Sequence, residues 1–490
     1  MNKTRQDMPL KKRPSAKLSI LPIIVLTIML TFTIRAFGSD SLSGASQITL
    51  LTVSAFCVLV GMAYLHVPWA SFEKAITKNV ASVSSALVIL LLIGALSGAW
   101  MLSGVVPTLI YYGVQIIHPD IFLASTCVIC AFVSVMTGSS WTTIATIGIA
   151  LMGIGRAQGF SEGWIAGAII SGAYFGDKIS PLSETTTLAS GSIGVSLFDH
   201  IKYMTITTIP SIAITVLIFL VSGFAFHTSN THDIEAFTLT LASRFSISPW
   251  LLLVPAITGV LIARKVPPVI TLFLSALLAV GFGCVFQQSV MTEIDPSLFK
   301  AAMKTLYGST SISTGNPILT DLVSTRGMAG MMDTIWLIIC AMCFGGTMAA
   351  SGFVGGITRL FIHLVKGRTS LVASTASTGV MLNVAIADQY LCILLTGNMF
   401  KDVYDRNGYE RRLLSRTTED SVTVTSVLVP WNTCGMTQST VLGVSTVAYL
   451  PYCFFNIISP LMSILVAAFG YKIFKKETGE TDSKQTQFQN

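Results

Sequence analysis

Long apolar runs recur along the whole chain, and short polar segments separate them. A helix of about 20 apolar residues is long enough to cross the hydrocarbon core of a bilayer. The pattern predicts eight uninterrupted membrane-spanning helices. They cover about residues 18–37, 47–66, 84–103, 205–226, 249–263, 267–286, 334–351 and 451–474.

Four further apolar segments contain polar residues near their centres. Segments 163–196 and 418–450 each hold a proline among polar side chains, which indicates a broken membrane-spanning helix. Segments 119–154 and 369–400 are long enough for two passes, and we interpret them as re-entrant hairpins. The predicted fold is therefore an all-α polytopic membrane protein with about ten transmembrane helices.

Composition supports this prediction and excludes an ordinary soluble enzyme. Of 490 residues, 52% are hydrophobic and 11% are charged, whereas soluble proteins carry roughly 25% charged residues. The net charge of +7 comes from Lys and Arg in short connecting segments, so we expect no nucleic-acid partner. The nine cysteines fall mostly in apolar runs, so we expect buried thiols and no cofactor.

The distribution of cations predicts the topology. Ten crossings and two hairpins that return to their own side place both termini on one face. Most of the 30 Lys and Arg residues fall on that face, which the positive-inside rule makes cytoplasmic. The long segment 287–333 then lies outside, and we expect one amphipathic helix in it.

Two parts of the chain resemble each other at a constant offset. Ala95–Val106 aligns with Cys343–Val354 when the sequence is shifted by about 248 residues, and Pro181 aligns with Pro430 one residue further. Five crossings separate the copies, so they are predicted to be inverted. Inverted repeats with broken helices are typical of transporters that bind substrate near the membrane midplane.

The predicted organisation follows from this repeat. Residues 1–83 form a basic cytoplasmic N-terminus and two peripheral helices, and residues 475–490 form a polar cytoplasmic tail. The first transport repeat covers residues 84–226, with its hairpin at 119–154 and its broken helix at 163–196, and the second covers residues 334–474, with its hairpin at 369–400 and its broken helix at 418–450. Residues 227–333 between the repeats form two linking helices and the outer loop.

The first broken helix contains charged residues that need a reason to lie in a membrane. We expect the helix to unwind across Asp177–Ser183, because Pro181 lacks a backbone N–H. Freed carbonyls, carboxylates and hydroxyls suit a hard cation such as Na⁺. The candidate ligands are Asp177, Ser180, Ser183, Glu184 and Thr185. The alternative is a polar loop outside the membrane that joins two short helices.

Other polar clusters supply further candidates. In the second hairpin, Asp388 is the only acid between Lys366 and Asp402, and we expect it to bind Na⁺ together with Asp177. The candidates near the second break are Asn432 and Thr433, and those at the first hairpin tip are Thr137, Ser139 and Ser140. Glu419 and Asp420 are either site acids or, as the preceding YERRLLSR favours, ion-pair partners where a helix enters from the cytoplasm.

The run FGDKISPLSETTTLA (175–189) resembles the signature of the NhaC-type Na⁺/H⁺ antiporter family. The resemblance implies secondary transport coupled to Na⁺ or H⁺ in a bacterial inner membrane. The family pattern would have Asp at Glu184, Asn at Thr187 and Pro at Ser190, and these departures leave the choice of ion open. The family also includes relatives of malate/lactate exchangers.

The leading hypothesis is Na⁺/H⁺ antiport by alternating access, with Na⁺ and H⁺ competing for Asp177 and Asp388. Lys178 would pair with Asp177 when Na⁺ is absent. The alternative is Na⁺- or H⁺-coupled exchange of an organic anion such as malate or lactate, bound by Lys178 and by helix N-termini near Ser183 and Asn432. An enzyme is not expected, since no catalytic or nucleotide motif is present. The expected partners are lipid, Na⁺, H⁺ and, in the alternative, a small carboxylate; a homodimer stays open.

Overall fold

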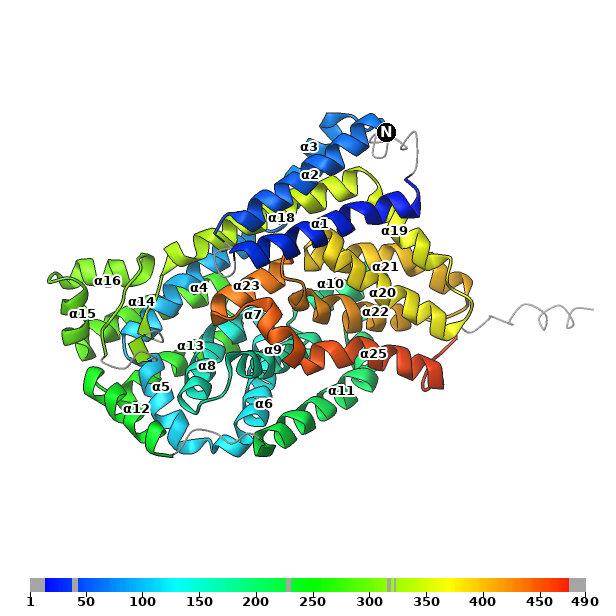
Figure 1. Ribbon diagram of the computed structural model, residues 1–490. Coiled ribbons are helices and arrows are strands. Elements are labelled where there is room, and N and C mark those ends of the chain that lie inside the picture. The colour runs from blue at the N-terminus through cyan, green and yellow to red at the C-terminus, as the bar shows by residue number, and fades with distance from the viewer. Residues whose placement is uncertain (1–13, 38–42, 226–230, 315–318, 321–322, 476–490) are drawn as a thin grey trace, which may run out of the picture.

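The protein is described by a computed structural model that covers residues 14–37, 43–225, 231–314, 319–320 and 323–475, without the side chains of 231–237. The predicted tail 475–490 and the first 13 residues of the basic N-terminus lie almost wholly outside these ranges. Eight described helices are long and apolar enough to cross a membrane, or up to ten if each of two bent pairs is one span. The chain is an all-α polytopic membrane protein, as predicted (Figure 1).

One layer of helices lies along the edge of the molecule (Figure 1). It consists of α1 (Ala16–Phe37), α2 (Ala45–Ala63), α3 (Trp69–Ser82), α18 (Met332–Ala350) and α19 (Phe353–Ile362). The side chains of Ile28 and Phe32 on α1 are 63% and 78% exposed, as expected of a helix that faces lipid. The sequence analysis did not predict α3, because its sequence WASFEKAITKNVAS is only half apolar.

A second group of helices lies at the opposite end from α19 and α25 (Figure 1). It consists of α4 (Ser84–Leu102), α5 (Val105–Ile116), α12 (Thr231–Arg244), α13 (Leu253–Ala263), α14 (Pro268–Phe286), α15 (Gln288–Ile294) and α16 (Leu298–Tyr307). The prediction of one amphipathic helix in 287–333 was wrong. The structure has α15, α16 and a 3₁₀-helix at Met328–Met331. Helix α15 ends before α16 because Pro296 lies between them, and Ser297 N donates to Asp295 Oδ1 (3.0 Å) in this connection.

The remaining helices form the two interrupted regions of the chain. The first contains α6 (Pro119–Thr137), α7 (Ser140–Thr143), a π-helix (Ile144–Gly148), α8 (Ile149–Ala157), α9 (Glu162–Ile179), α10 (Glu184–Ile193) and α11 (Leu197–Ala225). The second contains α20 (Arg368–Ile386), α21 (Gln389–Arg406), α22 (Arg411–Thr418), a π-helix (Glu419–Thr423), a 3₁₀-helix (Ser426–Leu428), α23 (Thr433–Leu442), α24 (Thr446–Tyr449), a 3₁₀-helix (Leu450–Tyr452) and α25 (Phe454–Phe469).

Backbone features recur in both regions at the offset seen in the sequence. Left-handed residues follow α6 at Gly138 and α20 at Ala387, which are 249 residues apart. The helices α10 and α23 begin and end at positions with the same separation. We propose on this basis that the regions are structural copies.

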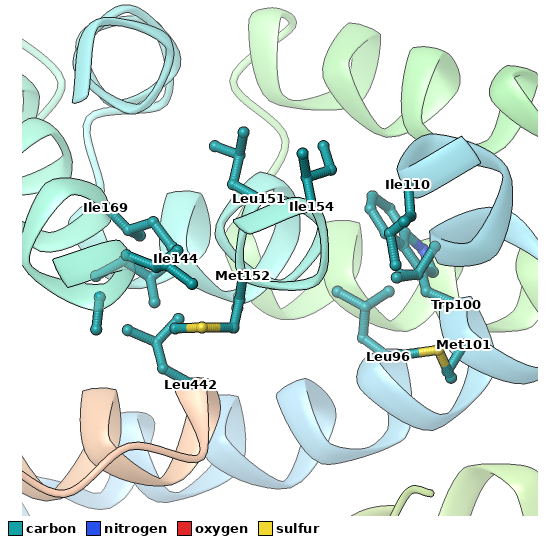
Figure 2. Packing of buried hydrophobic residues seen from close by; sticks show 14 of the residues in the cluster. Leu96, Trp100, Met101, Ile110, Ile144, Leu151, Met152, Ile154, Ile169 and Leu442 are labelled. Atoms are coloured by element: carbon teal, nitrogen blue, oxygen red, sulfur yellow. The ribbon is translucent and has the colours of Figure 1, made fainter. Parts of the chain in front are cut away.

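Apolar packing holds the first hairpin against its neighbours. Figure 2 shows Met152 of α8 extending toward Leu442 of α23, and both residues belong to one buried cluster. Trp100 of α4 lies in the same cluster and donates from Nε1 to Ser275 Oγ at 3.0 Å, so its polar atom is satisfied. The core thus fixes the hairpin tip relative to α4 and α23.

Candidate functional site

Asp177 lies in the last turn of α9, not in an unwound segment. The helix continues to Ile179, and Ser180 N still donates to Gly176 O at 3.1 Å. The backbone becomes extended only at Ser180 (φ −75°, ψ 131°), because Pro181 disfavours helical angles in the residue before it. The prediction of unwinding across Asp177–Ser183 was therefore too long, and the break covers residues 180–183 between α9 and α10.

Two hydroxyl groups from different elements donate to the Asp177 carboxylate. Ser140 Oγ, at the start of α7, lies 2.7 Å from Oδ2, and Ser183 Oγ, before α10, lies 2.6 Å from Oδ1. Asp177 is 6% exposed. The Ser183 hydroxyl also lies 3.0 Å from that of Thr185. The first hairpin tip and the helix break thus meet at one buried carboxylate.

Close packing of α6 against α9 positions this carboxylate. A Cβ at Gly176 would lie 2.5 Å from Ala131 O, so only glycine permits this approach. Ser180 Oγ donates to Val135 O at 2.8 Å and joins the break to α6. Ser180 is therefore tied to the backbone of α6 in this structure and does not face the cavity described below.

The second hairpin tip presents Asp388. Its side chain caps α21, since Oδ1 accepts from Leu391 N at 2.8 Å, and it is 1% exposed. Thr433 N donates to Ala387 O (2.9 Å), and Asn432 Nδ2 donates to Asn383 O (3.2 Å). These bonds hold the second break against the second hairpin, so Asn432 has a positioning role here.

A cavity of about 430 Å³ lies between the two hairpin tips. The predicted site residues that line it are Thr137, Ser139, Asp177, Glu184, Thr185, Asp388 and Thr433. Its wall also includes Ser82, Val83, Ser85 and Ala86 and the loop around Lys265. The structure therefore brings Asp177 and Asp388, more than 200 positions apart in the sequence, to one space.

Lys178 does not pair with Asp177, which corrects the prediction. Its Nζ donates to Asp420 Oδ1 and, at 2.9 Å, to Ser459 Oγ. Neighbouring residues on a helix project about 100° apart, so Asp177 and Lys178 point to different surroundings once both are helical. Lys178 is fully buried and is not part of the cavity wall.

The preferred interpretation of Glu419 and Asp420 as ion-pair partners at a cytoplasmic helix entry holds only in part: Asp420 is paired with Arg416 of YERRLLSR, but the acids lie in the protein interior. Both are fully buried in the π-helix that follows α22. Arg416, one turn earlier, is buried as well, and its Nε lies 3.9 Å from Asp420 Oδ2. The charged sequence YERRLLSRTTED therefore runs into the protein interior. The arginines in this sequence indicated a cytoplasmic position, so the burial of the two acids could not be recognised from the sequence.

Tyr390 and Gln389 are site residues that the sequence analysis missed. Tyr390 donates to Glu184 Oε2 at 3.0 Å, and Gln389 Nε2 donates to Thr423 O at 2.9 Å. Both line the cavity, and their position directly after Asp388 was the available signal. Together with the hydroxyls and carboxylates, they supply oxygen atoms to a cavity wall that is otherwise largely apolar, and such oxygen atoms suit a hard cation.

Comparisons with known proteins agree with this chemistry. Residues 172–471 match the model of the Na⁺/H⁺ antiporter family. The Na⁺/H⁺ antiporter NhaC of Alkalihalophilus pseudofirmus is 37% identical over 86% of this chain and 90% of its own. The malate-2H⁺/Na⁺-lactate antiporter of Bacillus subtilis is 35% identical over 91% of this chain and 92% of its own.

A solved structure, that of MtrF from Neisseria gonorrhoeae, covers 94% of this chain and 96% of its own at 14% identity, with a TM-score of 0.38. The family model and the relatives confirm the resemblance drawn from FGDKISPLSETTTLA, and the chain belongs to the Na⁺/H⁺ antiporter family.

Proposed function

We propose that this protein exchanges Na⁺ for H⁺ across the cytoplasmic membrane of a bacterium, with both termini in the cytoplasm. The observation that carries the proposal is the buried Asp177 carboxylate, which two hydroxyls orient at the wall of a cavity that further hydroxyl and carboxylate groups line. Na⁺ would bind at Asp177, with Asp388 supplying a further carboxylate. The Na⁺/H⁺ antiporter relatives support this cargo.

We propose that alternating access moves the two hairpins and the two broken helices relative to the other helices. Lys178–Asp420 joins α9 of one region to the second region at a fully buried point. We infer that the two interrupted regions move as one body, with the cavity wall at 82–86 and 262–268 as the opposing surface.

A proteoliposome assay tests the proposal. Purified protein is reconstituted with a pH-sensitive dye inside, and Na⁺, Li⁺ or K⁺ is added outside. An Na⁺-dependent rise in internal pH, absent with K⁺ and absent in Asp177→Asn, is the expected result. Equal responses to Na⁺ and K⁺, or no response to any cation, would contradict Na⁺/H⁺ exchange.

Exchange of a small carboxylate is the second candidate, and the size of the cavity favours it. A volume of about 430 Å³ falls in the range of small-molecule sites. The name of the malate-2H⁺/Na⁺-lactate relative describes exchange of such anions. Lys178 cannot serve as the anion's partner in this arrangement, because it bonds Asp420. Lys265 is the cation on the cavity wall. Malate- or lactate-driven flux that Lys265→Ala removes would favour this candidate.

A further inference from the structure

Glu419 and Asp177 are both buried carboxyl groups, but their surroundings differ. Asp177 accepts from two hydroxyls. Glu419 is 0% exposed, and neither of its oxygens accepts a well-aligned hydrogen bond among the described residues; the Thr423 hydroxyl is the one donor close enough to favour its ionised form. Hydrogen bonds donated to a carboxylate stabilise its ionised form, and a buried carboxylate without them is disfavoured. The surroundings of Asp177 therefore favour its ionised form, and those of Glu419 favour its protonated form.

The buried charges around Lys178 do not balance when all are ionised. We call Asp177, Lys178, Arg416, Glu419 and Asp420 the inner cluster. Asp420 contacts both cations of the cluster, Lys178 and Arg416. The three carboxyl groups face two cations, so the cluster lacks one positive charge. Because an uncompensated buried charge is costly, one proton or one further cation must accompany the cluster.

The hydrogen bonds decide which group takes the proton. Asp177 lies on the cavity wall, where a cation can reach it, and its hydroxyl donors favour the ionised form. Glu419 is not part of that wall. We propose, on the basis of the Na⁺/H⁺ exchange proposed above, that Na⁺ binds at Asp177 while the exchanged proton binds at Glu419, a separate carboxyl group.

Coupling between the two groups is electrostatic. Na⁺ at Asp177 supplies the missing positive charge, so the protonated carboxyl of Glu419 loses H⁺ to water and becomes a carboxylate. Loss of Na⁺ reverses the step, so one Na⁺ is exchanged for one H⁺. The charged groups that interact electrostatically with Glu419 are Asp177 and Lys178 from α9 and Asp420 beside it. Other titratable groups have different surroundings: Asp388 and Glu184 line the cavity, and His200 of α11 forms a hydrogen bond with Ser415.

Proton release on Na⁺ binding tests the inference directly. Detergent-purified full-length protein in weak buffer with a pH indicator is titrated with NaCl, while ²²Na⁺ binding is measured in parallel. The wild-type protein should release about one proton per bound Na⁺. Glu419→Gln, which mimics the protonated group, should bind Na⁺ only with the weak affinity that the wild type has at acidic pH, and it should release no protons. Glu162→Gln, at the exposed start of α9, is the matched control and should release protons like the wild type.

The pH dependence of Na⁺ affinity is the second measurement. Wild-type affinity should weaken toward about tenfold per pH unit on acidification, whereas that of Glu419→Gln should be nearly constant over the same range. Glu419→Asp keeps a carboxyl group and should restore proton release. If Glu419→Gln does not fold, the shifted pH profile of Glu419→Asp carries the test, and an unshifted profile contradicts the inference.

The outcomes separate this inference from the exchange that it rests on. Proton release by Glu419→Gln equal to that of the wild type would overturn it. Na⁺ affinity in a folded Glu419→Gln protein equal to that of the wild type at alkaline pH would overturn it as well, because the charge of Glu419 would then have no influence on the bound cation. A wild-type protein that binds no Na⁺ would instead refute the proposed function.

Discussion

Lys178 donates a hydrogen bond to Asp420, a residue 242 positions later in the chain, although Asp177 is its neighbour in the sequence. Both side chains are fully buried. The pair joins the end of α9 to the π-helix after α22, so each interrupted region contributes one charge. It also leaves the Asp177 carboxylate free to face the cavity.

Breaking this pair should destabilise the protein strongly. Lys178→Ala or Asp420→Ala leaves one buried charge without its main partner, at a cost of about 3–5 kcal/mol. The double variant Lys178→Met with Asp420→Leu removes both charges and should recover much of that loss. Thermal unfolding in detergent measures the effect. Single-variant losses that simply add in the double variant would argue against a direct pair.

Asp177→Asn should remove Na⁺-driven proton movement. The amide keeps the size of the side chain but loses the charge that attracts the cation, so Na⁺ affinity should fall about 100-fold or more. Ser140→Ala and Ser183→Ala each remove one hydroxyl donor and should weaken affinity by only about 3- to 10-fold. Transport rates in proteoliposomes over a range of Na⁺ concentrations distinguish these effects. Full exchange by a folded Asp177→Asn protein would contradict the assignment of Asp177 to the cation site.

Asp388→Asn should reduce Na⁺ affinity and leave the fold intact. Asp388 caps α21 through the bond to Leu391 N, and Asn is an equally good capping residue. Asp388→Ala loses both the charge and the cap, so it should also lower the melting temperature, by the equivalent of about 1 kcal/mol. Binding of ²²Na⁺ and thermal unfolding separate the two roles. Unchanged affinity in Asp388→Asn would exclude Asp388 from the site.

Gly138→Ala should displace the first hairpin tip. Gly138 has φ +68°, and a Cβ there would lie 2.7 Å from the backbone C of Leu182 in the helix break. The left-handed backbone alone costs about 1 kcal/mol for alanine. Gly191→Ala is the control, since nothing lies within 4 Å of its Cβ position. We expect reduced Na⁺ affinity and a lower melting temperature only in Gly138→Ala. Equal behaviour of both variants would show that the contact with Leu182 is unimportant.

The sequence predicted the helical membrane fold because apolar runs of bilayer length have few other structures. It also identified the breaks near Pro181 and Pro430 and the hairpin tips near Gly138 and Ala387, since proline and a change from apolar to polar residues are local signals. The short helices α3, α15 and α16 are less apolar or interrupted, so hydrophobic length alone did not reveal them.

Side-chain partners were decided by the tertiary structure. The sequence identified Asp177, Lys178, Glu419 and Asp420 as charges that need an explanation, but the direction of each side chain depends on where α9 ends. Because α9 continues one turn beyond Gly176, Asp177 faces Ser140 while Lys178 faces Asp420. Sequence alone thus identified Asp177, Lys178 and Asp388 as charged residues within apolar segments, whereas only helix packing showed that Glu419 and Asp420 are buried and which charges meet, because the partners of a buried charge are set by the elements that pack around it.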